Sequence, residues 1–568
     1  MENTTTDKTS VRILTEILIQ KGIKHVVLSP GSRNAPLLVA FARESSLEHY
    51  IILDERSAAF FALGMAQHSG EPVAIVCTSG TALLNYAPAV AEAYYQRLPL
   101  IVISADRPIE WIDQDDSQTI RQTGILAPIV KASYQLPAEP TSDDERWYVN
   151  RLTNDAVNCA LKGRRGPVHL NVPLREPLYG MKKIGREQAR TVEFIDTVET
   201  LAPDALEYLA VRFAACRRVM ILAGCHLPDE RLSTALHRLA AGDNVIILTE
   251  TPANVSSERH IATIDRVLAT LDELEMSDFA PDLLITFGGP LISKNIKKFL
   301  RVHRPLEHWS IDRSEHPADT FGGLTTQINL EAGAFFPLIV PHIPIVESDY
   351  AALWKNKKRI AEHRHNEFLR QASWSDWKAF SLILPALPTG SALQLANSTP
   401  VRYAQLFETR QVVRVDANRG TSGIDGSTST AVGAARLNNG LTTLITGDMA
   451  FLYDSNALWN PYISSRLKII VIRNGGGGIF RFIPGPSTLD ELDTCFETAQ
   501  QVDVNGFAAL HHFLYYCATS ADELQELLPV FFAPAERSAI LEITTPRFQN
   551  SEVLKDYFRH LHSPASNT

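Results

Sequence analysis

Two polar residues at the ends of neighbouring apolar runs could hold a divalent metal ion and a diphosphate. Asp448 comes after Thr442–Thr446 and Gly447, and Asn474 comes directly after Leu467–Arg473. Open α/β sheets bind ligands at the carboxyl ends of strands, which is where both residues would lie. A carboxylate, an amide oxygen and a backbone carbonyl are donors that Mg²⁺ prefers. By itself, the pair would also fit an ordinary surface loop.

The glycines around these residues favour the ligand-binding interpretation. Gly447 would let the backbone pass close to a phosphate, and Gly475–Gly478 directly follow Asn474. The arrangement resembles the thiamine-diphosphate motif, in which GDG is followed one strand later by NN. Met449 replaces the last glycine of that motif, and Arg473 replaces its first asparagine. The resemblance implies three ligands for Mg²⁺ or Mn²⁺: Asp448, Asn474 and the backbone carbonyl of Gly476.

Glu55 has the surroundings of the acid that activates thiamine diphosphate. In this enzyme class, a glutamate hydrogen-bonds N1′ of the aminopyrimidine ring and thereby assists removal of the C2 proton. Glu55 lies between the apolar strand Tyr50–Leu53 and the apolar helix Ser57–Gln67, where burial would raise its pKa. An acid facing the helix dipole would occupy the same place. Ile424 aligns with the apolar residue beneath the cofactor, although a core isoleucine would look the same.

Five sequence blocks resemble one family of thiamine-diphosphate enzymes. They are LSPGSRNAPL (28–37), LDERSAAFFALGMA (53–66), TSGTALLN (78–85), SADRP (104–108) and NRGTSGIDGSTSTA (418–431). They resemble the 2-succinyl-5-enolpyruvyl-6-hydroxy-3-cyclohexene-1-carboxylate synthase family, and the resemblance runs through essentially the whole chain. It implies decarboxylation of 2-oxoglutarate and 1,4-addition of the succinyl carbanion to isochorismate, in menaquinone biosynthesis.

Both implied substrates carry two carboxylates, which arginine binds through two parallel hydrogen bonds. The matching motifs place four arginines at turns or element ends: Arg33, Arg107, Arg402 and Arg419. Lys294 matches a family lysine, whereas Asn295 stands where the family often has a second basic residue. Three polar residues are candidates for positioning substrate: Ser32, Gln118 and Ser398. Three apolar residues would wall the pocket: Ile479, Phe480 and Ile483. For any single arginine, a surface salt bridge is the alternative.

Apolar runs alternate with amphipathic stretches throughout the chain, which predicts parallel sheets flanked by helices. We therefore expect an α/β fold with three consecutive domains of thiamine-diphosphate enzyme architecture. They are a pyrimidine-binding domain at residues 1–185, a central domain at 186–350, and a diphosphate- and metal-binding domain at 351–568. The clearest strands are His25–Ser29, Tyr50–Leu53, Pro72–Cys77, Leu100–Ser104, Gly166–Pro173, Arg218–Ala223, Asn244–Thr249, Asp282–Phe287, His308–Ile311, Thr442–Thr446, Leu467–Arg473 and Ala539–Thr544.

Composition argues against several classes of partner. The 54 basic and 64 acidic residues give a formal charge of -10, which disfavours a nucleic-acid partner and an anionic membrane surface. No apolar run is long enough for a membrane span, and the polar N-terminus does not resemble a signal peptide. Six scattered cysteines without a CxxC pair suggest buried thiols in a reducing compartment. We therefore expect a cytoplasmic protein.

In this enzyme class, the cofactor bridges the first domain of one subunit and the third domain of another. The resemblance therefore implies a homodimer or homotetramer. Two alternatives stay open: another thiamine-diphosphate decarboxylase or carboligase, similar to acetolactate synthase, and a non-catalytic paralogue of the fold. Enzymes similar to acetolactate synthase often carry a flavin-binding middle domain, and this chain shows no signature of one. Retention of Glu55, Asp448 and Asn474 together argues against the second.

Overall fold

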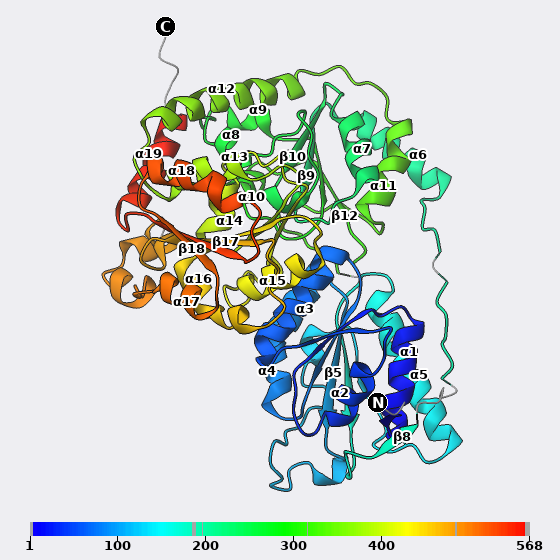
Figure 1. Cartoon of the computed structure of the whole chain (residues 1–568). Helices are drawn as coiled ribbons and strands as arrows, with labels where there is room; N and C mark the ends of the chain where they lie inside the picture. The colour runs from blue at the N-terminus through cyan, green and yellow to red at the C-terminus, as the bar shows by residue number, and fades with distance from the viewer. Residues whose placement is uncertain (1–3, 184–188, 196, 315, 483–484, 563–568) are drawn as a thin grey trace. The chain divides into compact units, whose positions relative to one another are not determined.

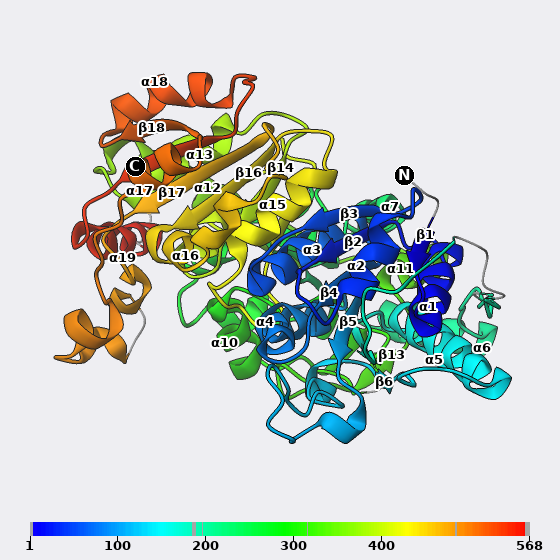
Figure 2. The same cartoon turned by 60° about the horizontal axis from the view of Figure 1, so that its bottom comes forward.

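The computed structural model describes residues 4–183, 189–195, 197–314, 316–482 and 485–562. The chain folds into two compact units, each of which is described by itself. The first comprises Met1–Asp196, Asn418–Asn439 and Tyr453–Leu467, and the second comprises Thr197–Ala417, Gly440–Leu452 and Lys468–Thr568. The units contain three large sheets flanked by helices, which confirms the predicted α/β class (Figures 1 and 2).

The first unit is built on a six-stranded parallel sheet in the order β3-β2-β4-β5-β7-β6. Its strands are β2 (His25–Leu28), β3 (Glu48–Ile51), β4 (Val73–Cys77), β5 (Leu100–Asp106), β6 (Ser133–Gln135) and β7 (Val168–Pro173). Every residue of β4, β5 and β7 is buried, as expected for central strands with both faces covered. A small antiparallel ribbon pairs β1 (Thr4–Thr6) with β8 (Met181–Lys183).

Six α-helices accompany this sheet: α1 (Thr9–Gln20), α2 (Ala35–Ala42), α3 (Glu55–Ser69), α4 (Thr81–Gln96), α5 (Asp143–Leu161) and α15 (Ser427–Leu437). Helices α3 and α15 pack closely, because glycines occupy their contact. A Cβ at Gly64 would lie 1.9 Å from the Thr430 carbonyl oxygen, and a Cβ at Gly433 would lie 1.9 Å from that of Phe61. Only glycine permits this approach of the two backbones.

The second unit holds two sheets. The first is parallel, in the order β10-β9-β11-β12-β13, with strands β9 (Val219–Ala223), β10 (Val245–Thr249), β11 (Leu283–Phe287), β12 (Glu307–Ile311) and β13 (Thr326–Ile328). Alternate residues of β9 enter two different cores: Val219 and Ile221 one, Met220 and Leu222 the other. Helices therefore cover both faces: α6 (Pro203–Ala214), α7 (Glu230–Leu239), α8 (Ile264–Leu268), α9 (Met276–Phe279), α10 (Lys294–Val302), α11 (Ala332–Ile339) and α12 (Tyr350–Gln371).

The other sheet of this unit has six strands in the order β15-β14-β16-β17-β19-β18. They are β14 (Ala392–Leu395), β15 (Arg414–Ala417), β16 (Thr442–Gly447), β17 (Leu467–Arg473), β18 (Leu514–Ala518) and β19 (Ala539–Thr544). Its helices are α13 (Asp376–Ala386), α14 (Thr399–Ala404), α16 (Asp448–Tyr453), α17 (Val504–Leu510), α18 (Ala521–Phe532) and α19 (Gln549–His562). Figure 2 shows β14, β16 and β17 side by side, as their neighbouring places in this order require.

Each predicted domain contains one of the three large sheets, while its boundaries remain predictions. The prediction of buried thiols is wrong for most of the cysteines. All six are free, but only Cys77 is buried, and Cys495 and Cys517 are exposed. Among the described residues, no helix combines the length and apolar character that crossing a membrane requires.

Candidate active site

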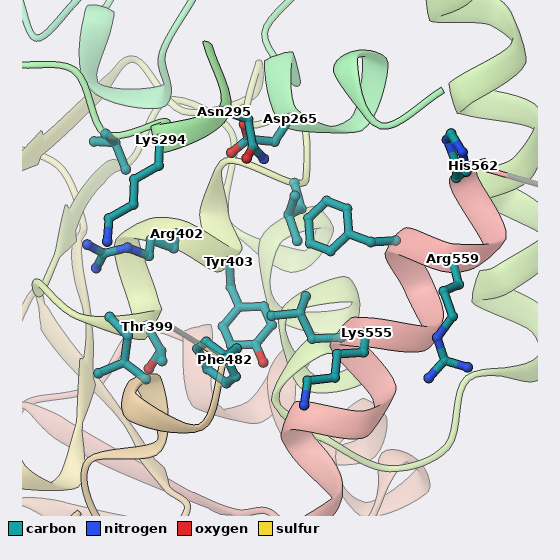
Figure 3. A pocket seen from close by; sticks show the side chains of 15 residues that line it. Asp265, Lys294, Asn295, Thr399, Arg402, Tyr403, Phe482, Lys555, Arg559 and His562 are labelled. Atoms are coloured by element: carbon teal, nitrogen blue, oxygen red, sulfur yellow. The ribbon is translucent and has the colours of Figure 1, made fainter. Parts of the chain in front are cut away.

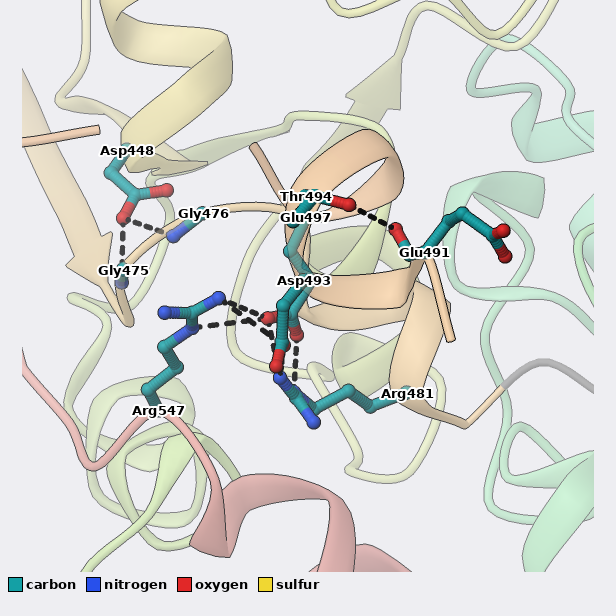
Figure 4. A network of polar contacts seen from close by, with 9 residues as sticks. All are labelled: Asp448, Gly475, Gly476, Arg481, Glu491, Asp493, Thr494, Glu497 and Arg547. Atoms are coloured by element: carbon teal, nitrogen blue, oxygen red, sulfur yellow. Dashed lines mark hydrogen bonds and ion pairs between the residues drawn. The ribbon is translucent and has the colours of Figure 1, made fainter. Parts of the chain in front are cut away.

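Asp448 lies at the carboxyl end of β16, where glycine peptides hold its carboxylate. The side chain is 3% exposed. Its Oδ2 accepts hydrogen bonds from the N–H groups of Gly475 at 3.0 Å and Gly476 at 3.1 Å (Figure 4), and Oδ1 accepts from Met449 N–H at 2.8 Å. Both glycines have left-handed φ angles, +85° and +107°. Burial raises the pKa of Asp448, and the backbone N–H groups oppose that shift.

Asn474 follows β17, the next strand in the sheet, and its orientation is set by a buried acid. Its Nδ2 donates to Asp376 Oδ2 at 2.8 Å, so the amide oxygen is the end left to serve as a ligand. Asp376 also accepts hydrogen bonds from Thr545 Oγ1 at 2.5 Å and Asn550 Nδ2 at 3.0 Å. Burial raises the pKa of Asp376 to about 6.

These donors fit a hard divalent cation. A carboxylate and an amide oxygen at adjacent strand ends suit Mg²⁺ or Mn²⁺, which keep further positions for phosphate oxygens and water. Within the described ranges, no group of three or more His, Cys, Asp or Glu side chains could hold a metal ion. The third predicted ligand, the Gly476 carbonyl, already accepts from Gly478 N–H.

An ion-pair network tethers the segment that follows these glycines. Glu497 is fully buried and pairs with Arg481 and, at 2.5 Å, with Arg547 (Figure 4). Asp493 pairs with the same two arginines. The network thereby joins the turn at Gly478–Arg481 to the loop before α19.

A cavity of about 830 Å³ in the second unit gathers several predicted residues. Lys294, Arg402 and Ile479 line it, and Arg402 Nη1 donates to the carbonyl of Ser398 at 2.5 Å. In Figure 3 the side chains of Lys294 and Arg402 extend to the same end of the cavity, and α19 forms another wall. Further lining residues that motif matching missed are Asp265, Tyr403, Phe482, Lys555, Phe558 and Arg559.

One predicted wall residue, Phe480, does not line the cavity. It packs against Phe496, with ring centroids 5.6 Å apart. Ile483 lies outside the described residues. The missed Phe482 lies three residues after Ile479, so only the fold of the turn decides which aromatic reaches the cavity.

Glu55 is the first residue of α3 in the first unit, so it is a helix-terminal acid. Its side chain is also half-buried. Asp54 caps the helix by accepting from Ser57 N–H at 3.0 Å. Burial raises the pKa of Glu55, and the neighbouring charge of Asp54 adds to that shift. A raised pKa makes the carboxyl easier to protonate, as a group that exchanges protons requires.

Asn34 holds the turn that follows β2 and carries Ser32 and Arg33. Asn34 accepts from Gly31 N–H at 2.9 Å and donates to the Ser29 carbonyl at 2.8 Å, which leaves Ser32 exposed. Arg33 donates to the Leu174 carbonyl at 3.0 Å and pairs with Glu176 at 3.1 Å.

Arg107 follows β5, and its positive charge acts on Arg33. Burial and the charge of Arg107 lower the pKa of Arg33. Arg107 contacts Ser79 Oγ at 3.0 Å, the Gln118 carbonyl at 3.4 Å, and the carboxylate of Asp116. The first unit thus brings Arg33 and Arg107 together, with Gln118 alongside.

A buried polar network adjoins Arg107, and no sequence motif predicts it. Gln122 accepts from Gly80 N–H at 2.7 Å and donates to Asn171 Oδ1 at 2.8 Å. Asn171 donates to Asp106 Oδ2 at 2.7 Å, and Asp106 Oδ1 accepts from the Arg107 N–H at 2.8 Å. The network therefore joins the loops that carry Ser79 and Arg107.

Arg419 and Ile424 lie on the loop before α15. Arg419 is buried, whereas Ile424 is half-buried, so Ile424 keeps surface that a ligand could cover. The loop is strained at Ser422, where a non-glycine residue has a φ of +67°.

The chain is similar to one protein-family model and to several named synthases. Residues 8–125 match the family described as "Thiamine pyrophosphate enzyme, N-terminal TPP binding domain". The 2-succinyl-5-enolpyruvyl-6-hydroxy-3-cyclohexene-1-carboxylate synthase of Porphyromonas gingivalis is 48% identical over 570 residues, covering 99% of this chain and 98% of its own. The synthases of Flavobacterium psychrophilum and Bacteroides thetaiotaomicron are 42% and 37% identical, and each comparison covers at least 96% of both chains.

The chain belongs to this synthase family. The matched residues 8–125 include Glu55 and identify a thiamine-diphosphate enzyme. Membership of the family confirms the prediction drawn from the sequence blocks. The roles of individual site residues remain predictions.

Proposed function

We propose that this protein is a transferase that decarboxylates 2-oxoglutarate and adds the succinyl unit to isochorismate, forming 2-succinyl-5-enolpyruvyl-6-hydroxy-3-cyclohexene-1-carboxylate in menaquinone biosynthesis. The observation that carries the proposal is the cavity with Lys294 and Arg402 at one end. Two cations at one end of a partly apolar cavity suit an organic acid, because they can bind a carboxylate while the apolar lining covers the carbon chain. Near full-length similarity to named synthases supports the same reaction.

Thiamine diphosphate, when bound, supplies the carbon nucleophile that carries the acyl unit between the two substrates. In this proposal, Asp448, Asn474 and the Gly476 carbonyl hold Mg²⁺ or Mn²⁺ against the diphosphate, and Gly447 leaves room for it. Ile424 would offer its half-buried side chain to the cofactor, and Glu55 would hold or give up a proton at its carboxyl beside the pyrimidine ring.

The remaining residues bind and orient the acids. Four arginines and a lysine supply the positive charge: Arg33, Arg107, Arg402, Arg419 and Lys294. Ser32, Gln118 and Ser398 add hydrogen-bonding groups, and Ile479 and Phe482, which line the cavity, exclude water. Because the overall charge is -10, attraction of the two acids depends on these local cations.

The proposed assembly is a homodimer or homotetramer with active sites between subunits, in the cytoplasm. The subunit arrangement rests on the family resemblance. Six free cysteines suit a reducing compartment and support the proposed location.

The test is an assay with 2-oxoglutarate, isochorismate, thiamine diphosphate and Mg²⁺. We expect CO₂ and the coupled product in equal amounts, loss of both after chelation of the metal, and recovery with Mg²⁺ or Mn²⁺. Release of CO₂ without coupled product would contradict the synthase assignment while leaving the thiamine-diphosphate assignment intact. No turnover under any of these conditions would favour a non-catalytic paralogue.

A further inference from the structure

Two buried glutamates each hold a backbone segment beside one of the proposed substrate-binding cations. Glu92 on α4 is 1% exposed, and Glu250, directly after β10, is 2% exposed. Glutamate is rarely enclosed to this degree unless hydrogen bonds compensate for lost water. In both cases, the compensation comes from two successive peptide N–H groups.

Glu92 accepts hydrogen bonds from the loop that follows Arg419. Its Oε1 accepts from Gly420 N–H at 2.6 Å, and its Oε2 accepts from the N–H and the hydroxyl of Thr421 at 2.7 Å and 2.6 Å. A Cβ at Gly420 would lie 2.6 Å from the Glu92 carbonyl oxygen, so glycine is needed for this close approach. The peptide immediately after Arg419 is therefore fixed against α4.

Glu250 does the same for the turn that precedes Lys294. Its Oε2 accepts from Ile292 N–H at 2.5 Å, and its Oε1 accepts from Ser293 N–H at 2.8 Å. Ser293 caps α10 by accepting from Ile296 N–H at 3.1 Å, so Lys294 is the first residue of that helix. The carboxylate thus fixes the peptides from which Lys294 extends into the cavity.

We propose that Glu92 and Glu250 are positioning residues that orient Arg419 and Lys294 toward the substrate carboxylates. A carboxylate that accepts from two successive N–H groups restrains both peptide planes, and hence the direction in which the adjacent side chain leaves the backbone. The cation then meets its substrate without first ordering its loop. This inference rests on the proposed function, because it assumes that Arg419 and Lys294 bind the two acids.

The test compares Glu92→Gln and Glu250→Gln with Arg419→Ala and Lys294→Ala. Glutamine has almost the same shape as glutamate, but its amide N–H₂ group cannot accept a hydrogen bond from a backbone N–H. One of the two backbone hydrogen bonds is therefore lost. Each cation variant shows, through its KM values, which acid its side chain binds. We expect each glutamine variant to raise the KM for that same acid about tenfold, with kcat changed less than about threefold. A double variant such as Glu92→Gln with Arg419→Ala should be no worse than Arg419→Ala alone.

The outcomes separate the two proposals. Unchanged KM values in both cation variants would overturn their substrate roles and weaken the proposed function. Two results would overturn only the positioning role, provided that the cation variants raise KM. One is an unchanged KM in the glutamine variants, and the other is a double variant in which the two increases in KM multiply. Where a glutamine variant does not fold, Glu92→Asp or Glu250→Asp replaces it, since aspartate keeps the charge but shortens the reach. An unchanged KM in these milder variants would also count against positioning.

Discussion

Glu55 combines a helix-terminal position with burial, and both properties bear on its proposed role. Replacement by glutamine removes the proton that the carboxyl can exchange while leaving the size of the side chain almost unchanged. We expect Glu55→Gln to lower kcat/KM by at least about 100-fold, in the range typical of a lost acid–base group. Steady-state kinetics at saturating thiamine diphosphate and Mg²⁺ would measure the loss.

Glu71, an exposed glutamate just beyond the same helix, provides the matched control. Glu71→Gln should leave kcat/KM unchanged. Equal losses in Glu55→Gln and Glu71→Gln would indicate a general effect of charge and would count against a specific role for Glu55.

The raised pKa of Glu55 also predicts a dependence of stability on pH. Because its folded-state pKa lies above the unfolded value, the stability it contributes is fully present below the unfolded pKa and is lost as pH rises through the folded one. Glu55→Gln should therefore unfold at a higher temperature than the natural protein at neutral pH. The difference should shrink on acidification toward pH 4, near the ordinary pKa of glutamate at about 4.3.

Thermal unfolding of the cofactor-free protein between pH 4 and pH 8 would measure this. A Glu55→Gln protein less stable than the natural one at neutral pH would show that the carboxyl is not held at a cost in the folded state. An activity loss together with a stability gain would identify Glu55 as a residue kept for function.

At the scale of elements, the contact between α3 and α15 depends on two glycines. Gly64→Ala would place a Cβ 1.9 Å from the Thr430 carbonyl oxygen, which the helix backbones must move apart to admit. We expect a destabilisation of about 1–3 kcal/mol, as for other overpacked contacts, measured by denaturant unfolding. Gly323→Ala is the control, since a Cβ there meets no atom within 4 Å and its φ is not left-handed. Equal stability of the two variants would contradict the close helix contact.

The sequence predicts the apolar elements well because burial on both faces leaves a continuous apolar run. β17 has the predicted bounds, Leu467–Arg473, and β9 differs by one residue. The strands β14 and β15 were missed because they carry polar residues that become buried together. Gln394 Nε2 donates to Asp416 Oδ2 at 3.4 Å across these two strands, a pairing that no local pattern indicates. Short strands such as β6 and β13 give too little pattern to detect.

Some residues of the candidate site can likewise be predicted from the sequence, and others cannot. Asp448 and Asn474 were predictable because each directly follows an apolar strand that ends at the same sheet edge. Asp376 and Gln122 were not, because their partners lie far away in the chain: Asn474 is 98 positions from Asp376, and Gly80 is 42 positions from Gln122. Residues whose partners lie far along the chain therefore require the fold, whereas the strand-end positions of the candidate ligands Asp448 and Asn474 do not.

At the scale of the whole molecule, Glu55 and Asp448 belong to different compact units, which raises the question of which chains complete one active site. If each site lies between subunits, a chain lacking Glu55 and a chain lacking Asp448 can still form one intact site in a mixed dimer. We therefore expect Glu55→Gln and Asp448→Ala proteins, each inactive alone, to recover part of the activity after subunit exchange.

Random exchange between equal amounts of the two chains makes half of the dimers mixed, and each mixed dimer would hold one intact site out of two. About a quarter of the natural activity per site is therefore expected, by simple mixing statistics for a C₂ dimer. Native mass spectrometry of differently tagged chains would establish that exchange occurred. Verified mixed dimers without activity would have two explanations. Either both residues of a site come from one chain, or each substitution also impairs the neighbouring site. Mixing the natural protein with each variant distinguishes these explanations. Full activity of natural–variant mixed dimers at their unaltered sites would leave the single-chain site as the remaining explanation.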